Sequence, residues 1–207
     1  MKRYYPIMLD LDGKQVVVVG GGKVAERKVL GLLEANANVT IISPTVTEGL
    51  SELVQKQRIQ WKEKTFESKD LTYPLLVFGA TNNKSVNKEV RKAAEEKQLL
   101  CLLVDSPLES DFQVPSTVTR GRLQLTISTS GASPTLAKKI KQELENKYDE
   151  SYESFVDFLF DARQKIINEI EDPAIKSNLL TAIIDKNFYE NSNRKEMFEE
   201  LLKQALK

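Results

Sequence analysis

Three consecutive glycines after a short apolar run form the motif with the clearest chemical meaning. Gly20, Gly22 and Ala25 fit G-x-G-x-x-A, directly after the run VVVV at 16–19. In such a context the first glycine makes a tight turn, the second lets backbone approach a pyrophosphate, and the small third residue allows close helix packing. The following helix directs free N–H groups at the anion. The motif predicts a dinucleotide site; the alternatives are a glycine turn without a ligand, or a site for another adenine-containing molecule.

The residues after the second predicted strand would hold the adenosine ribose. The motif expects an acidic residue about 20 positions on, and Ser43 and Pro44 stand there instead. A serine hydroxyl can bond a ribose hydroxyl, and no arginine stands beside it to bind a 2′-phosphate. We therefore favour NAD over NADP. The alternative for Ser43 is a turn residue that ends the strand.

Two more polar positions follow predicted strands. Thr81 and Asn82 come after the apolar run 75–80, and Asp105 comes after the run 100–104. Ligands of open α/β sheets bind at the carboxyl edge of the strands, so these side chains are candidates for cofactor or substrate contact. We expect Asp105 to be partly desolvated and to act as a base or hold a cation. The alternatives are plain turn and cap roles, with Asn83 as the candidate cap of the next helix.

The chain of 207 residues contains no histidine and one cysteine. These counts exclude histidine-dependent triads, histidine-ligated zinc and an internal disulfide, and we expect no metal site. Proton transfer must fall to a carboxylate, another side chain or a cofactor. Lys and Arg (30) balance Asp and Glu (30), which predicts no general attraction to nucleic acid or to an anionic membrane.

The apolar runs also favour a soluble protein. The longest, residues 99–104, is far shorter than the roughly 20 residues that span a bilayer. The basic start at Met1 and Lys2 leads into no continuous apolar segment before Asp10, so no signal peptide is expected. We expect a cytoplasmic location.

Strands and helices alternate in the first half of the chain. Strands are predicted at 16–19, 39–42, 59–62, 75–80 and 100–104, and helices at 24–35, 46–56 and 85–96. This order predicts an α/β fold, a Rossmann-type doubly wound parallel sheet with right-handed crossovers.

The pattern changes after residue 105. Residues 106–122 have no clear period and are predicted as loop, 123–129 as a strand, and 134–147 as a helix capped by Ser133. From residue 152 the pattern is helical, with breaks before 173 and 192 and a capping box of Ser192 and Glu196. We expect a cofactor domain at 1–112, a small β-α dimerisation segment at 113–147 and a helical domain at 148–207.

The junction between the 123–129 strand and the next helix is rich in hydroxyls. Ser128, Ser130 and Ser133 accompany a glycine there, and basic side chains flank it: Arg120, Arg122, Lys138 and Lys139. Free N–H groups at the helix start could bind a carboxylate. Simple N-capping by Ser133 and solvated lysines are the alternatives.

Six segments, in this order, match a known family. They are PIMLDL at 6–11, VVGGGKVAERK at 18–28, ATN at 80–82, VDSP at 104–107, FQVPS at 112–116 and STSGASP at 128–134. Together they resemble the precorrin-2 dehydrogenase family of sirohaem biosynthesis. The resemblance is close up to about residue 147 and loose over the helical tail.

The resemblance implies that NAD⁺ takes a hydride from precorrin-2 to give sirohydrochlorin, in a homodimer. By position, the cofactor-binding residues would be Gly20, Gly22, Lys23, Val24 and Ala25 at the pyrophosphate, Ser43 and Pro44 at the ribose, and Thr81 on the nicotinamide side. Asp105 matches the family's catalytic carboxylate. Precorrin-2 carries many carboxylates, and we expect Arg120, Ser128, Ser130 and Lys138 to bind them.

Two other functions stay open at this point. Some family members also insert iron, which would make the chain a sirohydrochlorin ferrochelatase as well. Alternatively, it is a sensing module that binds NAD without turnover and uses its helical tail as a partner surface. Loss of turnover in an Asp105→Ala variant that still binds NAD would distinguish an enzyme from such a module.

Overall fold

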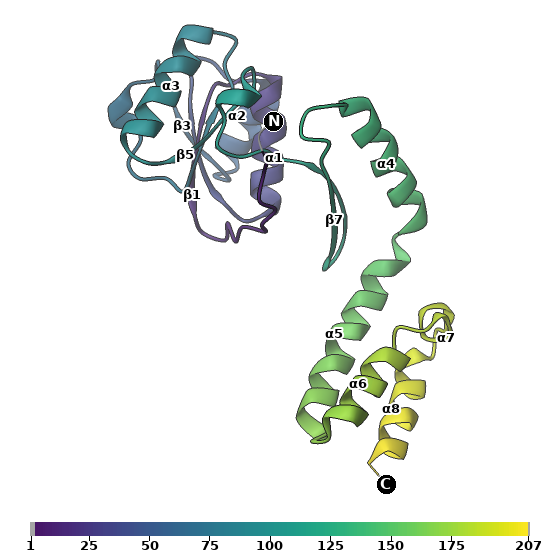
Figure 1. Ribbon diagram of the computed structural model, residues 1–207. Helices are drawn as coiled ribbons and strands as arrows, with labels where there is room; N and C mark the ends of the chain where they lie inside the picture. Colours follow the sequence, from purple (N-terminus) through teal and green to yellow (C-terminus); the bar gives the residue numbers. More distant parts are fainter. Residues whose placement is uncertain (1–2, 207) are drawn as a thin grey trace. The chain divides into compact units, whose positions relative to one another are not determined.

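A computed structural model describes residues 3–206. Met1 and Lys2, on which part of the signal-peptide expectation depended, lie outside the described residues. The chain divides into two compact units, 1–114 and 115–207, drawn in Figure 1. The second unit begins at 115, two residues after the start of the segment expected at 113–147, and it contains the rest of that segment together with 148–207. The separation of these segments into two domains stays a prediction.

The first unit is built on a five-stranded parallel sheet. Its strands are β1 (Gln15–Val19), β2 (Asn38–Ile42), β3 (Gln60–Lys62), β4 (Leu76–Gly79) and β5 (Leu100–Leu103), in the order β3-β2-β1-β4-β5. Val18 of the central strand aligns with Ile41 on one side and Phe78 on the other. Four of the five β1 side chains are buried, because a central parallel strand is covered on both faces. The predicted doubly wound sheet is confirmed.

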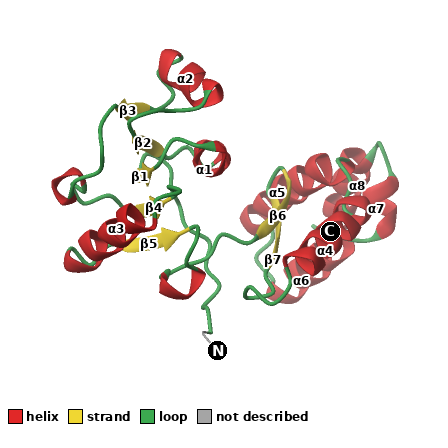
Figure 2. Ribbon diagram, turned by 90° about the horizontal axis from the view of Figure 1, so that it is seen from above, coloured by secondary structure: helices red, strands yellow, loops and turns green. Residues whose placement is uncertain are grey.

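Helices cover both faces of this sheet. They are α1 (Lys23–Glu34), α2 (Glu48–Gln55) and α3 (Lys84–Glu96), with short 3-10 turns η1 (Ser68–Asp70) and η2 (Pro107–Glu109). Val29 of α1 and Leu50 of α2 join one apolar core, and Val90 of α3 joins the other. Figure 2 shows α1 and α3 on opposite sides of the strands. The strand order reverses between β1 and β4, so ligands are expected at the carboxyl ends of these two strands.

The outer edge of β5 is closed by the chain itself. Ser110 and Asp111 lie along it: the Leu103 N–H donates to Ser110 Oγ (2.9 Å), and the Asp111 N–H donates to the Cys101 carbonyl (2.8 Å). The Asp111 carboxylate accepts the Cys101 N–H (2.9 Å) and pairs with Arg91 of α3. These bonds satisfy backbone groups that an open edge strand would expose.

The second unit combines a hairpin with helices. β6 (Ser116–Arg120) and β7 (Leu123–Ile127) form the hairpin, on which α4 (Pro134–Lys147) packs through Ala137. The remaining helices are α5 (Ser151–Glu169), α6 (Pro173–Ala182), α7 (Lys186–Glu190) and α8 (Arg194–Ala205). They surround an apolar core that includes Phe155, Ile166 and Phe198.

Three expectations for this part of the chain are wrong. Residues 106–122 are not all loop, because 116–120 pair with 123–127 as β6. The short helix α7 was not expected. The Ser192 and Glu196 capping box does not begin α8: the N-cap Asn193 makes no side-chain cap bond, and its N–H donates to Asn191 Oδ1 (2.8 Å). An Asx-type turn therefore begins this helix.

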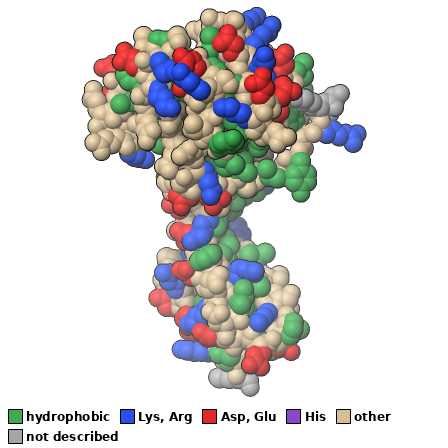
Figure 3. All heavy atoms as spheres, turned by 90° about the vertical axis from the view of Figure 1, so that its left-hand side faces the viewer, with side chains coloured by type: hydrophobic (Ala, Val, Ile, Leu, Met, Phe, Trp, Pro, Cys, Tyr) green, Lys and Arg blue, Asp and Glu red, His purple; other side chains and the backbone are tan. Residues whose placement is uncertain are grey.

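The hydropathy of the helices and the distribution of charge on the surface both agree with the composition. No helix within residues 3–206 is long and apolar enough to span a membrane. On the face drawn in Figure 3, acidic and basic side chains are both spread over the surface.

Candidate cofactor and reaction site

The three glycines after β1 have different surroundings. Gly20 has φ of +118°, and a Cβ there would lie 2.4 Å from the Ala80 carbonyl oxygen. A Cβ on Gly21 would lie 2.0 Å from the Thr45 carbonyl oxygen, whereas one on Gly22 would meet nothing within 4 Å. Packing therefore requires the first two glycines, and Gly22 faces open space where a ligand's phosphates could approach.

Helix α1 begins at this open position without a side-chain cap. Gly22 is its N-cap and offers no side-chain acceptor, whereas Thr47, Asn83 and Ser133 cap α2, α3 and α4. The N–H groups of the first turn of α1 thus keep their capacity to donate, and the helix dipole adds positive potential there. This combination fits a pyrophosphate.

The side chains that follow Gly22 divide into exposed and buried ones. Lys23 and Val24 are exposed beside the helix start, and Lys23 pairs with Glu26 (3.3 Å). Ala25 is fully buried. Its side chain therefore contributes the close packing of helix on strand, and only its backbone could contact a cofactor.

Glu26 joins α1 to the start of α2. Its Oε2 accepts a hydrogen bond of 2.5 Å from the Thr47 hydroxyl, and the Thr47 N–H donates to the Gly21 carbonyl (2.9 Å). The Thr47 hydroxyl, followed by Lys23, lowers the pKa of Glu26. Thr47 thereby links the glycine turn, through the Gly21 carbonyl, to Glu26 of α1.

Ser43 lies beneath the same turn. It is 8% exposed, and its carbonyl accepts the Trp61 indole N–H (2.9 Å). Its hydroxyl would lie 3.0 Å from a Cβ on Gly21, while Pro44 is exposed. The geometry gives Ser43 a supporting place under the turn, and its contact with ribose stays a prediction.

Thr81 follows β4 and its hydroxyl is engaged within the unit. Oγ1 lies 2.7 Å from Asn87 Oδ1 and 3.0 Å from the Asn83 carbonyl oxygen. Asn83 caps α3 by accepting the Ser85 N–H (2.9 Å), which confirms the capping role given as its alternative. Thr81 is half-buried, so contact with the nicotinamide side stays a prediction.

Asp105 and Cys101 belong to β5 and the loop after it. Asp105 is exposed, so the expected partial desolvation is wrong within this unit. The reason is local, because β5 ends at Leu103 and Asp105 stands in the following loop. Cys101 is buried, and burial raises the pKa of its thiol to about 11, so the thiol is a poor candidate for proton transfer, whereas the Asp105 carboxylate is exposed just after the strand.

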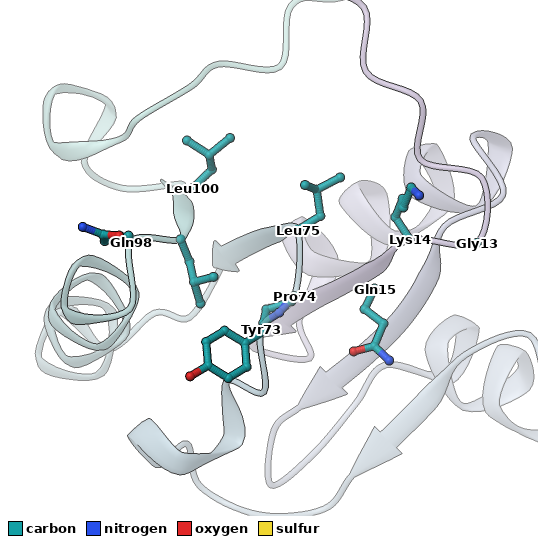
Figure 4. Close-up of a pocket in the computed structure, with 9 residues that line it drawn as sticks. Gly13, Lys14, Gln15, Tyr73, Pro74, Leu75, Gln98 and Leu100 are labelled. Atoms are coloured by element: carbon teal, nitrogen blue, oxygen red, sulfur yellow. The ribbon is translucent and has the colours of Figure 1, made fainter.

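A hollow of about 410 Å³ lies at the opposite edge of the sheet (Figure 4). Tyr73, Leu75 and Leu100 line it with Lys14 and Gln15, at the amino ends of β1, β4 and β5. The glycine turn follows the carboxyl end of β1, so this hollow is separate from the candidate cofactor site.

In the second unit, the hydroxyl-rich junction connects β7 to α4. The Ser130 N–H donates to Ser128 Oγ (3.1 Å), and Ser133 caps α4 by accepting the Leu136 N–H (3.1 Å). The capping role of Ser133 is confirmed. Ser128, Ser130 and Lys138 are exposed and available to an anionic ligand.

Arg120 lies at the other end of the hairpin. It opposes Leu123, and Ser128 comes five residues after Leu123, about 17 Å along an antiparallel strand. Its guanidinium donates to the carbonyls of Thr119 (2.9 Å) and Glu145 (3.4 Å). Within this unit Arg120 therefore does not join Ser128, Ser130 and Lys138 in one cluster; its guanidinium bonds to its own strand and to the last turn of α4.

Known proteins resemble this chain over most of its length. Family models match residues 7–116 (putative NAD(P)-binding), 120–147 (sirohaem biosynthesis protein central) and 152–198 (SirC C-terminal domain). A precorrin-2 dehydrogenase of Priestia megaterium is 39% identical over 184 residues, 89% of this chain and 91% of its own length. The chain belongs to the precorrin-2 dehydrogenase family.

Other members agree with this assignment. The precorrin-2 dehydrogenase of Bacillus subtilis is 31% identical over 77% of this chain and 98% of its own. A solved structure of SirC, precorrin-2 dehydrogenase, is 37% identical, covers 98% of both chains and gives a TM-score of 0.82. The likeness therefore extends over both units, including the helices that the sequence segments matched only loosely.

The cofactor of this family fits the residues present. NAD carries a pyrophosphate, and the open, uncapped start of α1 at Gly22 offers backbone donors to one. The carboxyl edges of β1 and β4 adjoin this point at Gly20 and Ala80. The first unit is the NAD-binding domain of this dehydrogenase family.

Three contributors were not singled out from the sequence. Gly21 was the unspecified position in the motif, and its requirement comes from Thr45, which the fold brings beneath it. The Glu26 to Thr47 bond spans 21 residues and has no local signal. Asn87 occupies a buried position on α3, where the helical period gave the only available hint.

The Glu26 bond predicts a pH-dependent contribution to stability. Because its pKa is lowered in the folded unit, the stabilisation is present above the unfolded pKa and is lost as pH falls through the folded pKa. We expect Glu26→Gln to lower the urea midpoint near neutral pH, with the difference from the unmodified protein disappearing as the pH falls through the folded pKa of Glu26. Urea titrations at several pH values would measure this.

The matched control is Glu52→Gln. Glu52 is an exposed carboxylate that pairs with Lys56 (3.2 Å) on α2, so its removal is expected to change the midpoint by much less. A Glu26→Gln effect of equal size at every pH would contradict the role of the charged form.

Proposed function

We propose that this protein oxidises precorrin-2 to sirohydrochlorin with NAD⁺ as the hydride acceptor. The observation that carries the proposal is the open, uncapped start of α1 at Gly22, in a chain that belongs to this dehydrogenase family. A glycine turn that served packing alone would not need Gly22, where a Cβ meets nothing within 4 Å.

The reaction removes two hydrogens from the macrocycle, one as a hydride and one as a proton. NAD⁺, when bound, supplies the acceptor for the hydride. Asp105 accepts the proton as general base, since it is an exposed carboxylate at the carboxyl edge of the sheet. The absence of histidine from all 207 residues supports a carboxylate in this role.

The pyrophosphate is held by backbone N–H groups that follow Gly22, with Lys23 and Val24 beside it. Pro44 lies on the ribose side with Ser43 beneath it, and Thr81 lies on the nicotinamide side. In the second unit, Ser128, Ser130 and Lys138 bind substrate carboxylates: all three are exposed near the start of α4. Arg120 is a weaker candidate because Thr119 and Glu145 engage it.

The protein acts as a homodimer in the cytoplasm. Apolar side chains that a single chain leaves exposed support the dimer: Ile7 is 60%, Met8 65%, Leu108 80% and Leu136 49% exposed. Association of two copies would remove part of this surface from water. A biosynthetic substrate and a nicotinamide cofactor support the location.

An anaerobic assay tests the function. Precorrin-2 is incubated with the protein and NAD⁺, and absorbance follows the formation of NADH and of sirohydrochlorin. We expect one NADH for each precorrin-2 consumed, and less activity with NADP⁺ in place of NAD⁺. Fe²⁺ is then added to the finished reaction, and the metal-bound product is sought by its own absorbance.

The outcomes separate the candidate functions. Stoichiometric NADH supports the dehydrogenase, and metal insertion faster than in a protein-free control adds the chelatase activity. Failure to form NADH with either nicotinamide cofactor would refute the proposal. Retained NAD⁺ binding in that case would indicate the sensing module.

A further inference from the structure

Asn87 is a buried polar side chain that the proposed reaction does not use. It lies on α3 and is 1% exposed. Its neighbours on the helix, Val90 and Ala94, belong to the apolar core between α3 and the sheet. A buried amide is unfavourable unless its donors and acceptor are bonded, so its partners indicate its role.

Three hydrogen bonds join the Asn87 amide to a single residue, Thr81. Oδ1 accepts the Thr81 hydroxyl (2.7 Å) and the Thr81 N–H (3.3 Å), and Nδ2 donates to the Thr81 carbonyl (3.0 Å). The side chain therefore fixes the hydroxyl and both backbone groups of Thr81. Such a bond set determines a backbone position more closely than a single cap bond would.

The backbone of Ala80 and Thr81 packs directly against Gly20 of the glycine turn and forms a wall beside it. A Cβ on Gly20 would lie 2.4 Å from the Ala80 carbonyl oxygen and 3.1 Å from the Thr81 N. Any displacement of the 80–81 backbone would therefore either press on Gly20 or open a gap beside it. Since Gly20 leads directly into Gly22, the position of the phosphate-binding turn depends on where this wall stands.

We propose that Asn87 is a positioning residue for the cofactor site, which holds the Ala80 and Thr81 backbone against the glycine turn. It acts through Thr81 and does not itself touch NAD. The inference depends on the proposed function, because it assigns the Gly20 to Gly22 turn to NAD binding. It adds a residue of α3, which covers the opposite face of the sheet from α1, to the residues that determine NAD affinity.

The chemistry of the amide provides a specific test. In Asn87→Asp, a protonated carboxyl keeps an acceptor for the Thr81 N–H and a donor for the Thr81 carbonyl. The ionised form has no donor and places negative charge against that carbonyl. Burial favours the neutral form, so the variant is expected to resemble the unmodified protein at low pH and to fail at high pH.

Few other charged groups adjoin this position. Strands β4 and β5, on which α3 packs, contribute only the buried Cys101 thiol. The turn η1 contributes Asp70, bound to Lys64 (3.1 Å), and Lys69. On α3 itself Arg91 pairs with Asp111, and its remaining charged side chains are exposed. The other charged groups are the same in Asn87→Asp and in the unmodified protein. A pH-dependent difference between the two is therefore expected to come from the introduced carboxyl.

The experiment measures NAD⁺ affinity by calorimetry at about pH 5.5 and about pH 8.5. We expect Asn87→Asp to bind within about threefold of the unmodified protein at the lower pH, and at least about tenfold more weakly at the higher. Asn87→Ala should be at least about tenfold weaker at both. In the precorrin-2 assay, with precorrin-2 saturating and NAD⁺ varied, the alanine variant should show a raised KM for NAD⁺ with a smaller change in kcat.

Asn38→Asp is the matched control, because Asn38 is an exposed amide at the start of β2 that donates to the Gly13 carbonyl (2.9 Å). It is expected to match the unmodified protein at both pH values. Near-UV circular dichroism of Trp61 reports whether each variant is folded. If Asn87→Asp unfolds at high pH, the comparison is made with Asn87→Ala at low pH, where the aspartate is expected to restore affinity.

Equal affinities of Asn87→Asp and Asn87→Ala at low pH would overturn the inference. Affinity of Asn87→Ala equal to that of the unmodified protein would do the same. These readouts are independent of turnover: failure to oxidise precorrin-2 would refute the proposed function alone, and NAD⁺ binding would still report on Asn87.

Discussion

Replacing Gly22 with aspartate is expected to weaken NAD⁺ binding by at least about 100-fold, or ~2.7 kcal/mol. The new carboxylate would stand at the start of α1, where a Cβ meets only open space. It would accept the N–H groups that otherwise bind the pyrophosphate, and it would repel the phosphate charges. Calorimetric titration with NAD⁺ measures the loss.

The same substitution is expected to leave the fold as stable or make it more so. Gly22 has φ of −86° and ψ of −176°, an N-cap geometry that aspartate adopts readily. Aspartate is a better N-cap than glycine, and its negative charge interacts favourably with the positive end of the helix dipole. Together these two effects add about 0.5 to 1 kcal/mol to the free energy of unfolding. Thermal unfolding without ligand should show an unchanged or raised midpoint.

Two alanine variants complete the comparison. Gly22→Ala should fold normally and bind NAD⁺ less tightly, because its methyl group fills the space of the phosphates. Gly21→Ala should be destabilised by about 1 to 3 kcal/mol, since its Cβ would lie 2.0 Å from the Thr45 carbonyl oxygen. NAD⁺ affinity of Gly22→Asp within threefold of the unmodified protein would contradict the assignment of the phosphate site.

Asp105→Asn is expected to lower the turnover of precorrin-2 by about 100-fold to 10,000-fold, the range that a general base contributes. The amide has nearly the same shape but cannot accept the proton. Asp105 is exposed, so the substitution leaves no buried group without a partner, and NAD⁺ affinity should change less than about twofold. Initial rates of NADH formation and calorimetry give the two numbers.

The matched control is Glu109→Gln in the 3-10 turn of the same loop. Glu109 is also an exposed carboxylate, so its replacement removes the same charge four residues away. It should retain turnover within about threefold. Normal turnover by Asp105→Asn would instead assign the proton to another acceptor.

The fold of the first unit was predictable because its signals are local and repeated. Val16 to Val19 form an apolar β-branched run, which a strand buried on both faces requires, and the predicted strand of 16–19 became β1 of Gln15–Val19. Helical period and turn residues separate each strand from the next. The right-handed crossover rule then leaves few topologies.

The hairpin of the second unit was only half predicted. β7 alternates apolar and polar residues, whereas β6 reads Ser-Thr-Val-Thr-Arg, with one buried apolar side chain at Val118. A signal was present: two β-rich runs stand on either side of Gly121 and Arg122, a two-residue connection typical of hairpins. Prolines before the run concealed it.

The candidate site was predictable where one residue's own backbone or position decided its role. Gly20 and Gly22 were found because the motif describes local conformation. The contacts of Ser43 and Asn87 depend on residues that the fold brings together from other elements, such as Trp61 and Thr81. A periodicity in one segment contains no information about these partners.

The bonds at the edge of β5 have a consequence for the rate of the reaction. Ser110 Oγ bonds to Leu103 N (2.9 Å) and to the Ser106 carbonyl (3.1 Å), so both ends of the segment that bears Asp105 are tied together. Its loss of conformational entropy therefore occurs once, during folding. If Asp105 is the base, as proposed, each catalytic cycle would begin with its backbone already ordered, and the reaction barrier would not include the ordering of this loop.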